Sequence, residues 1–444
     1  MAALPTLPKD VFADRRKRLM ESLGGRGAAL FFAAPEATRS NDSEFDYRQN
    51  SDLYYLTGFE EPESAVLLLP GHGTHPFVMF VRKRDREREI WDGFRAGVEG
   101  AKAEFGAQEA FLVDDLDAKL PELLEGRDRL VYGLGLYPDR DTQVVRALTK
   151  VRHLAKKGKR APREVVDPSV VLHEMRCVKT AQEVEALRRA AQVSAEAHVR
   201  AMKATRPGLT EFEIQAEIEY LFKRRGAKAP GYTTIVGSGA NACVLHYVTN
   251  RDVLKAGDLL LVDAGAEVDY YTGDITRTWP VSGTFDAPQR EVYDLVLRAQ
   301  EEVIAMAKPG LLWPAMHEKA VQVLTQGLVD LGALKGPVEK AIEDKTYRAF
   351  YMHSTGHWLG MDVHDVGGYY ADADRGRPLE PGMVFTVEPG LYFHADAKDC
   401  PERWKGIGVR IEDDLLVTET GCEVLSKDAP KRPDDLEAIV GTGV

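Results

Sequence analysis

The chain has 444 residues, of which 44% are hydrophobic and 29% charged, an ordinary composition for a globular protein. Its length predicts two or three domains with large cores, and its composition excludes a disordered, fibrous or membrane-embedded protein. The 58 Lys and Arg residues against 70 Asp and Glu residues give a net charge of -12. A protein that follows a phosphate backbone usually has the opposite balance, so we expect no nucleic-acid partner.

The cysteines and the N-terminal segment indicate a cytoplasmic protein. Cys177, Cys243, Cys400 and Cys422 lie far apart, without the CxxC pair of a zinc ribbon or a redox motif. Reduced thiols are typical of the cytoplasm. No apolar run precedes the first charged residues, and the longest apolar run, residues 28–35, is too short to cross a bilayer. We therefore expect cytoplasmic localisation and no membrane partner.

The first 170 residues alternate short apolar runs with helical patterns. The runs at residues 65–69, 77–81 and 130–132 predict buried strands. Residues 17–23 and 116–124 predict helices between these strands. The alternation predicts an α/β domain with a core of its own.

A basic stretch follows at residues 152–163. No aromatic residues interleave it and the whole chain is acidic, so we interpret it as a solvated loop near a domain boundary rather than as a nucleic-acid site. After it the pattern changes to long amphipathic helices, and we place the boundary near residue 172.

Four amphipathic helices are predicted in the second part of the chain. Thr180 and Glu183 have the spacing of a capping box, and Thr210 and Glu213 give a similar start signal. Pro309 follows the third helix and ends it. The predicted helices span residues 180–202, 210–222, 289–307 and 314–331.

Apolar strands in the same part of the chain end in polar residues. Residues 259–262 and 384–387 predict buried strands, and residues 409–417 predict a third. Alternation in the third places Arg410 and Glu412 on one face. Helices and strands together predict an α+β domain with a largely antiparallel sheet.

Four carboxylates and one imidazole occupy these strand ends and Gly-rich turns. Buried carboxylates repel one another and their pKa values rise, and a divalent cation relieves both problems. The set exceeds what one catalytic Zn²⁺ needs, and it suits two divalent ions that share carboxylates and a water. Oxygen-rich ligation with a single His favours Mn²⁺, with Co²⁺ or Zn²⁺ able to substitute. The residues are Asp263 in LLLVDAG, Asp274 in TGDITRT, His357 in HSTGHWLG, Glu388 in FTVEPG and Glu412 in VRIEDD.

The order of these motifs resembles that of aminopeptidase P and prolidase, metallopeptidases of the pita-bread fold, which methionine aminopeptidase and creatinase share. The similarity also covers residues 231–247 and several N-terminal segments, so it spans nearly the whole chain. The N-terminal segments are residues 39–44, 47–52, 55–59 and 88–93.

The resemblance implies an α/β N-terminal domain of the aminopeptidase P type at residues 1–172 and an α+β pita-bread catalytic domain at residues 173–444. The implied activity is hydrolysis of the bond between an N-terminal residue and a following proline, so the expected partners are peptides with proline at the second position.

Prolidase, which cleaves only Xaa-Pro dipeptides, shares every ligand and stays an alternative. A non-enzymatic peptide-binding protein of the same fold is an alternative from another class, although such proteins typically lose ligands that this chain retains. The N-terminal motifs and the chain length favour the aminopeptidase. Methionine aminopeptidase generally lacks the N-terminal domain, and creatinase works without this metal set.

The resemblance assigns each metal-binding residue a role. Asp263 resembles a bidentate ligand of one metal, and Asp274 and Glu412 resemble bridging carboxylates. His357 and Glu388 resemble ligands of the second metal, and Glu388 is also the candidate general base.

Further residues resemble catalytic or supporting groups of the family. His246 and His364 resemble the histidines that contact the scissile carbonyl and the proline side of the substrate, and His353 resembles a further site histidine. Arg410 and Tyr232 resemble groups that orient the first carboxylate ligand.

Two candidates for substrate binding lie in the N-terminal part. Trp91 resembles an aromatic residue that reaches toward a substrate pocket, in some members that of a neighbouring subunit, and Asp42 is the second candidate. Family members form dimers and tetramers, so we expect a homo-oligomer.

Overall fold

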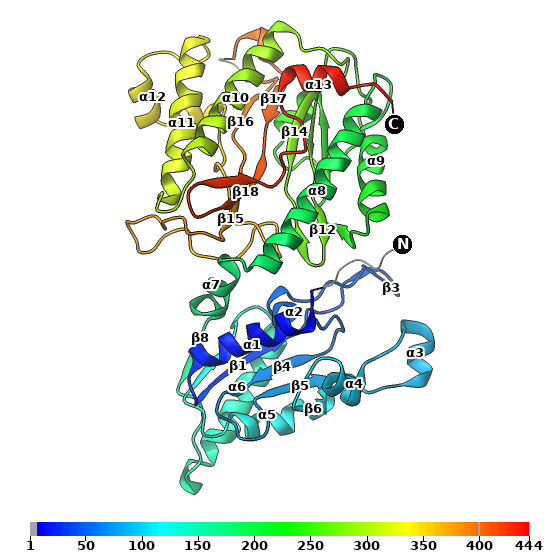
Figure 1. Ribbon diagram of the computed structural model, residues 1–444, viewed down its shortest axis with the longest axis vertical. Helices are drawn as coiled ribbons and strands as arrows, with labels where there is room; N and C mark the ends of the chain where they lie inside the picture. The colour runs from blue at the N-terminus through cyan, green and yellow to red at the C-terminus, as the bar shows by residue number, and fades with distance from the viewer. Residues whose placement is uncertain (1–6, 398–399, 444) are drawn as a thin grey trace. The chain divides into compact units, whose positions relative to one another are not determined.

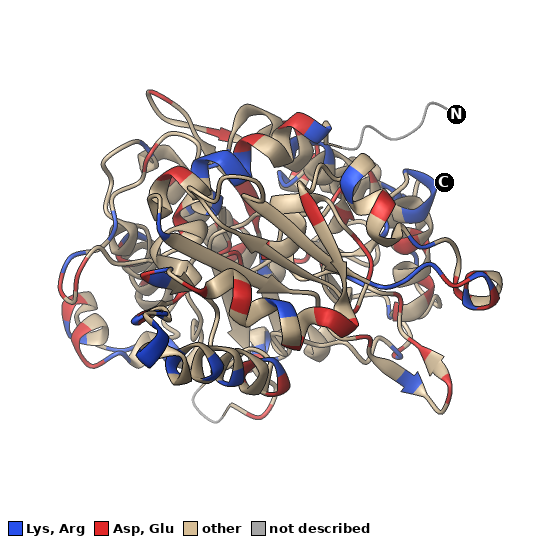
Figure 2. Ribbon diagram, turned by 90° about the horizontal axis from the view of Figure 1, so that it is seen from below, with Lys and Arg blue, Asp and Glu red and all other residues tan. Residues whose placement is uncertain are grey.

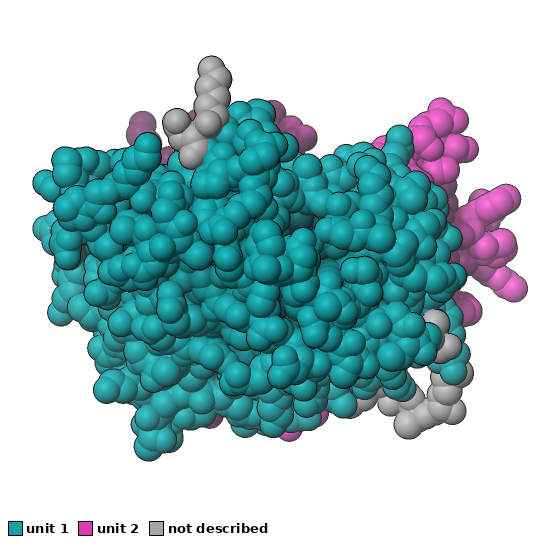
Figure 3. Space-filling model, turned by 90° about the horizontal axis from the view of Figure 1, so that it is seen from above, with its two compact units in different colours: residues 1–4, 176–444 teal, residues 5–175 magenta. Residues whose placement is uncertain are grey.

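The computed structural model describes residues 7–397 and 400–443, which form two compact units that divide between Met175 and Arg176 (Figures 1 and 3). The predicted boundary, residue 172, is the first residue of helix α7 (Leu172–Cys177), which spans this division. The domain assignment at that residue stays a prediction. Within the described ranges no helix combines the length and apolar character needed to cross a membrane.

A six-stranded mixed sheet forms the centre of the N-terminal unit, in the order β6-β5-β4-β1-β7-β8. Strand β4 pairs antiparallel with β1 and β5, whereas β1 pairs parallel with β7. Strands β1, β4 and β5 are completely buried, which agrees with their continuous apolar sequences. The strands are β1 (Gly27–Phe32), β4 (Ala65–Leu68), β5 (Phe77–Val81), β6 (Glu109–Leu112), β7 (Arg129–Val131) and β8 (Glu164–Val166), with a separate hairpin of β2 (Thr38–Ser40) and β3 (Ser43–Glu44).

The first helix of this unit begins earlier than its sequence predicts. Arg15 and Arg16 interrupt the apolar stripe of α1, yet both are buried because their guanidinium groups donate to the carbonyl oxygens of Tyr55 and Leu56, at 3.2 and 2.7 Å. The predicted start at residue 17 is therefore wrong. In the sequence, two charged residues on the buried face break the apolar pattern by which the earlier part of the helix would be predicted. The helices are α1 (Lys9–Leu23), α2 (Ser51–Thr57), α3 (Arg86–Asp92), α4 (Gly97–Ala103), α5 (Leu116–Leu124) and α6 (Pro138–His153).

The basic stretch at residues 152–163 connects α6 to β8 and is almost entirely exposed. Lys159 forms an ion pair with Glu125, and beside the stretch Arg129 pairs with Glu164 at 2.7 Å. Figure 2 shows basic residues next to acidic ones over much of the chain. The acidic neighbours partly neutralise this basic stretch.

Antiparallel strand pairs form the sheets of the second unit. Strand β11 lies between β10 and β14, and β18 lies between β15 and β19. Strands β16 and β17 form a further antiparallel pair, and β12 pairs with β9 and β13. The strands are β9 (Ala229–Pro230), β10 (Ile235–Ser238), β11 (Leu259–Asp263), β12 (Ala266–Val268), β13 (Tyr271–Thr272), β14 (Thr276–Pro280), β15 (Val384–Val387), β16 (Gly390–Phe393), β17 (Ile407–Arg410), β18 (Asp413–Val417) and β19 (Cys422–Val424).

Long helices of the second unit flank these strands (Figure 1). Both predicted start signals are confirmed: Thr180 with Glu183, and Thr210 with Glu213, form complete capping boxes. Rows of buried apolar residues on α8, α10 and α11 join one large core with the strands. The helices are α8 (Ala181–Ala204), α9 (Glu211–Arg224), α10 (Ala287–Met306), α11 (Trp313–Asp330), α12 (Val338–Glu343) and α13 (Pro433–Ile439).

The predicted single strand at residues 409–417 is wrong in one respect, because the structure divides it into β17 and β18. Strand β17 pairs with β16, whereas β18 pairs with β15 and β19. Between them the amide of Glu412 donates to the carbonyl oxygen of Thr276 at 3.0 Å. The chain thus stays extended but changes its pairing partner, which local alternation does not reveal.

A buried charge cluster ties the start of the second unit to the loop before β15. Arg176 lies 2.6 Å and Lys179 3.1 Å from the two oxygens of Asp365. Burial raises the pKa of Asp365, but the charges of Arg176 and Lys179 outweigh it and hold the pKa below its ordinary value. This cluster anchors the segment that contains His364.

Asp365→Asn is expected to lower the free energy of unfolding by about 3 kcal/mol at neutral pH, because it removes the carboxylate that pairs with buried Lys179 and leaves Arg176 with the more exposed Asp362 at 2.8 Å. The folded-state pKa of Asp365 is depressed, so its contribution is fully present above roughly pH 4, the unfolded value, and is lost as the pH falls through the folded value. Urea unfolding of both proteins at pH 7 and pH 3 measures this.

The difference between variant and parent should shrink at pH 3, and an equal difference at both values would contradict the argument. Asp372→Asn is the matched control, since Asp372 pairs with Arg375 at an exposed position and its loss should change stability little.

Candidate metal centre

A cavity of about 750 Å³ opens in the second unit where several strands end. Its wall combines carboxylates, histidines and aromatic side chains. All five predicted metal ligands line it, as do the three predicted histidines and both supporting residues. The lining residues that the argument uses are Tyr232, His246, Asp263, Asp274, Trp313, His353, His357, His364, Tyr369, Glu388, Arg410 and Glu412.

Each carboxylate reaches the cavity from the end of a strand or from a turn. Asp263 is the last residue of β11, and Asp274 precedes β14 in the adjacent turn. Glu388 follows β15 directly, and Glu412 lies between β17 and β18. Strand β11 pairs with β14, β15 pairs with β18, and the amide of Glu412 donates to Thr276 at the start of β14, so segments up to 149 residues apart in the sequence (263 to 412) converge at one place.

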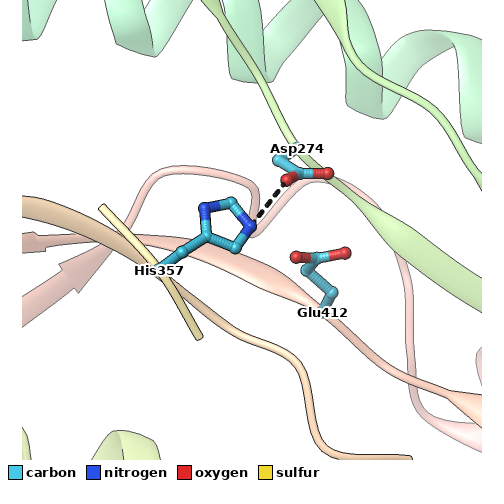
Figure 4. Close-up of side chains that lie close together, drawn as sticks. All are labelled: Asp274, His357 and Glu412. Carbon is cyan, nitrogen blue, oxygen red and sulfur yellow. Dashed lines mark ion pairs between the residues drawn. The ribbon is translucent and has the colours of Figure 1, made fainter. Parts of the chain in front are cut away.

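Asp274, His357 and Glu412 form the tightest cluster, with one ligand atom from each lying within 4.8 Å of the others (Figure 4). His357 Nε2 lies 3.3 Å from Asp274 Oδ2 and 3.7 Å from Glu388 Oε1. The amide and imidazole of His357 are also held, because its backbone N–H donates to Thr386 and its Nδ1 lies 3.0 Å from the carbonyl oxygen of Trp358. Nε2 therefore faces the carboxylates.

Tyr232 and Arg410 hold Asp263 from two sides. The Tyr232 hydroxyl lies 2.5 Å from one oxygen of Asp263 and 2.5 Å from one oxygen of Asp274. Arg410 donates to the other oxygen of Asp263 at 2.6 Å. A hydroxyl donates a single hydrogen, so Tyr232 satisfies only one of its two carboxylates at a time. The site therefore has more carboxylate oxygens than protein donors to fill them.

Two glycines allow the turns that carry Asp263 and Asp274 to approach each other. A Cβ atom on Gly265 would lie 1.6 Å from the carbonyl oxygen of Gly273, and one on Gly273 would lie 2.7 Å from Ser194 Oγ. Any side chain at Gly265 would push the two carboxylate-bearing turns apart. The glycines of the DAG and TGD sequences are therefore needed for steric reasons.

The acidity of the cluster provides a test of whether metal ions fit. Burial raises the pKa of Glu388 to about 7, and burial together with neighbouring carboxylates raises those of Asp274 and Glu412. Burial lowers the pKa of His357, but the hydrogen bond and charge of Asp274 outweigh it and raise the pKa to about 9. Divalent cations would favour the ionised carboxylates. The donor set fits such cations.

The three further histidines surround this cluster differently. The ring of His364 lies 4.2 Å from that of His357, centroid to centroid, and burial lowers its pKa, which favours the neutral imidazole. Burial also lowers the pKa of His353 to about 3. Its Nε2 lies 2.9 Å from the Tyr392 hydroxyl, which accepts from Arg410 at 3.1 Å. His246 reaches the cavity from the irregular loop between β10 and β11.

An aromatic wall was not predicted from the sequence. Trp313 contacts Trp358 and Tyr369, with ring centroids 4.3 and 4.9 Å apart, and Trp358 stacks on Tyr369. Trp313 and Tyr369 face the cavity. Trp313 opens an amphipathic helix and Tyr369 lies in an irregular segment, so neither position carries a signal that separates it from ordinary core packing.

The two N-terminal candidates, Asp42 and Trp91, lie in the other unit. Asp42 is exposed in the turn between β2 and β3. Trp91, on α3, is 84% exposed and has exposed apolar neighbours in Ile90 and Phe94. Their part in substrate binding stays a prediction.

Comparison with known proteins identifies the family. Residues 185–419 match metallopeptidase family M24, and residues 12–132 match the aminopeptidase P N-terminal domain. The chain is 46% identical over 435 residues to an Xaa-Pro aminopeptidase of Escherichia coli K12, covering 98% of each chain. The chain belongs to the Xaa-Pro aminopeptidase family of M24 metallopeptidases.

Other relatives support the same family assignment. It is 34% identical to human Xaa-Pro aminopeptidase 3, covering 98% of this chain and 86% of the relative. An aminopeptidase of Pseudomonas aeruginosa superimposes with a TM-score of 0.95 at 49% identity, and zinc-substituted Escherichia coli aminopeptidase P in complex with product with 0.94 at 46%, each covering 98% of both chains. The predicted fold, an α/β aminopeptidase P domain followed by an α+β pita-bread metallopeptidase domain, is confirmed.

Proposed function

We propose that this M24 enzyme is an aminopeptidase that uses two divalent metal ions to hydrolyse the bond between an N-terminal residue and a following proline. The observation that carries the proposal is the convergence of four carboxylates and an imidazole in one cavity. The similarity to Xaa-Pro aminopeptidases over almost the whole chain supports the specificity.

Five residues would hold the ions. Asp263 would bind one ion, His357 and Glu388 the other, and Asp274 and Glu412 both. The ions would make a water in the cavity strongly nucleophilic and polarise the scissile carbonyl. Four carboxylates and one imidazole are a set in which oxygen predominates, and this supports Mn²⁺ as the resident metal, with Co²⁺ or Zn²⁺ able to replace it.

The Xaa-Pro bond is a tertiary amide without an N–H, and its substituents obstruct general peptidases. Glu388 takes the proton of the attacking water and returns it to the departing proline nitrogen. His246 and His364 face the same cavity, where their imidazole N–H groups donate to the carbonyl oxygen as charge develops on it.

The supporting residues hold Asp263 in place. Arg410 donates to Asp263 and to the Tyr392 hydroxyl, and Tyr392 in turn lies beside His353. We assign His353 an action on Asp263 through this chain of hydrogen bonds. Tyr232 holds Asp263 from the opposite side.

The substrate would lie against both the polar and the aromatic wall. Its free amine would meet a bound cation or a carboxylate such as Asp263, and its proline ring would lie near His246 and His364, with Trp313 and Tyr369 offering further apolar surface. The volume of about 750 Å³ leaves room beyond a dipeptide, which supports an aminopeptidase over prolidase.

Peptides of graded length distinguish these two activities. We expect an Xaa-Pro-Yaa tripeptide and longer peptides to be cleaved with a kcat/KM at least about 10-fold above that of the Xaa-Pro dipeptide, because residues after proline add contacts in the cavity. Peptides with alanine in the second position serve as controls. A strict preference for the dipeptide would instead assign prolidase activity.

We also propose that the chain forms a dimer or tetramer in the cytoplasm. The apolar side chains of Ile90, Trp91 and Phe94, 76%, 84% and 91% exposed, support an interface at α3. Trp91 and Asp42 would then contribute to substrate binding. The four cysteines are all free thiols, which supports a reducing compartment. Light scattering of the purified chain would disprove the assembly by showing only monomer.

A further inference from the structure

The loop that carries His246 has little regular structure of its own. Between β10 and β11 it contains only a short 3-10 helix, η4 (Gly239–Cys243), and its remaining residues to 258 form neither helix nor strand. His246 is exposed, and no described residue forms a hydrogen bond with its ring. The position of this imidazole therefore depends on how the loop backbone is held.

Glu211, the first residue of α9, lies under this loop and is completely buried. Its carboxylate accepts five hydrogen bonds of 2.8–3.0 Å from a segment of 15 residues (238 to 252). The donors are Ser238 N, Ser238 Oγ and Asn241 Nδ2 to Oε1, and Tyr247 Oη and Asp252 N to Oε2.

The two oxygens hold opposite ends of the loop. Oε1 of Glu211 accepts hydrogen bonds from Ser238 and Asn241 at the start of the loop, and Oε2 accepts them from Tyr247 and Asp252 at its end. His246 lies between these two groups and is the direct neighbour of Tyr247. The Glu211 carboxylate thus joins the two ends of the segment that carries His246.

Helix capping does not account for Glu211. The amide and hydroxyl of Thr210 donate to Glu213, which completes the capping box. Among the described residues no Lys, Arg or His forms an ion pair with Glu211. Burying an unpaired anion is costly, and five neutral donors offset that cost only while the loop keeps its shape. The anion and the loop conformation therefore require each other.

We propose that Glu211 is the positioning residue for His246. This inference rests on the proposed function, in which His246 donates to the scissile carbonyl. Glu211 contacts neither substrate nor metal in this scheme. It fixes the backbone on both sides of His246, and a displacement of about 1 Å at a reacting group is enough to cost roughly 100-fold in rate.

Two variants release the loop to different degrees. Glu211→Gln replaces one carboxylate oxygen with an NH₂ group that faces hydrogen-bond donors, and we expect kcat/KM for an Xaa-Pro-Yaa peptide to fall about 100-fold. Tyr247→Phe removes one of the five donors, and we expect a fall of about 5-fold, mainly in kcat. Glu213→Gln, in the same helical turn but exposed, is the matched control and should retain the parent kcat/KM.

A double-mutant cycle with His246→Ala tests whether the effect passes through His246. In the His246→Ala background, Glu211→Gln should reduce kcat/KM by less than about 3-fold, because the group that it positions is already absent. Fully multiplicative effects would overturn the proposal, since a general structural role costs the same in either background. If Glu211→Gln does not fold, the same cycle with Tyr247→Phe decides.

Binding of Mn²⁺ measured by calorimetry provides a second readout. The loop contains no candidate ligand, so Glu211→Gln should leave the Mn²⁺ affinity within about 2-fold of the parent, and a loss of affinity matching the loss of kcat/KM would overturn a role through His246. A parent protein that cleaves no Xaa-Pro peptide would remove the proposed function and this inference together. An active parent with a multiplicative cycle removes the inference alone.

Discussion

Replacement of Glu388 with glutamine is expected to lower kcat on an Xaa-Pro-Yaa peptide by about 1000-fold or more. The amide has nearly the shape of the carboxylate but takes up no proton, so the attacking water loses its base and the proline nitrogen its acid. Glu388 lines the cavity and its Oε1 lies 3.7 Å from His357 Nε2, so its carboxylate lies within the proposed metal cluster.

The chain offers a matched control within the same sequence pattern. Glu380, Pro381 and Gly382 repeat the Glu-Pro-Gly sequence that begins at Glu388, but Glu380 is exposed and pairs with Arg377 at 3.6 Å. Glu380→Gln should keep the parent rate and the parent Tm, and both variants are assayed at saturating Mn²⁺ because Glu388 is also a proposed metal ligand. A rate for Glu388→Gln within about 10-fold of the parent would remove Glu388 from the mechanism.

Removal of divalent metal is expected to abolish turnover, and addition of Mn²⁺ to restore it. Without cations, Asp274, Glu388 and Glu412 face one another with raised pKa values, so the ionised cluster that the reaction needs is disfavoured. Each cation, at 100 times its Kd, would also stabilise the folded chain by about 2.7 kcal/mol. Activity and Tm should therefore recover over the same range of Mn²⁺ concentration.

A ligand variant sharpens this experiment. Glu412→Gln removes a carboxylate proposed to serve both ions, so the Mn²⁺ concentration for half-maximal reactivation should rise about 10-fold or more. Elemental analysis of the chelated protein gives the residual metal. Full turnover at zero measured metal, in persistent excess chelator, would contradict the two-ion proposal.

Much of the carboxylate cluster is predictable because its signal is local. An Asp or Glu at the end of an apolar strand, as at Asp263 and Glu388, is conspicuous, and a period of two places Arg410 and Glu412 on one side; both line the cavity. The capping boxes of α8 and α9 were predictable for the same reason. Such patterns need only a few neighbouring residues.

Other features depend on contacts between distant segments. Nothing near Glu211 in the sequence distinguishes it from a second acidic residue in a helix's first turn, since its partners lie 27 to 41 residues away. Trp313 and Tyr369 belong to the cavity only because α11 and the segment before β15 meet there. The early start of α1 was missed because buried arginines resemble solvent-exposed ones in sequence.

The charge cluster around Asp365 limits how an isolated catalytic fragment can be designed. The similarity to the M24 family begins at residue 185, which would be an obvious place to cut. Arg176 and Lys179 lie ahead of that point, so a fragment starting there would bury Asp365 without either cation. A truncated enzyme therefore has to retain the chain from before Arg176, although those residues lie outside the region by which the family is recognised.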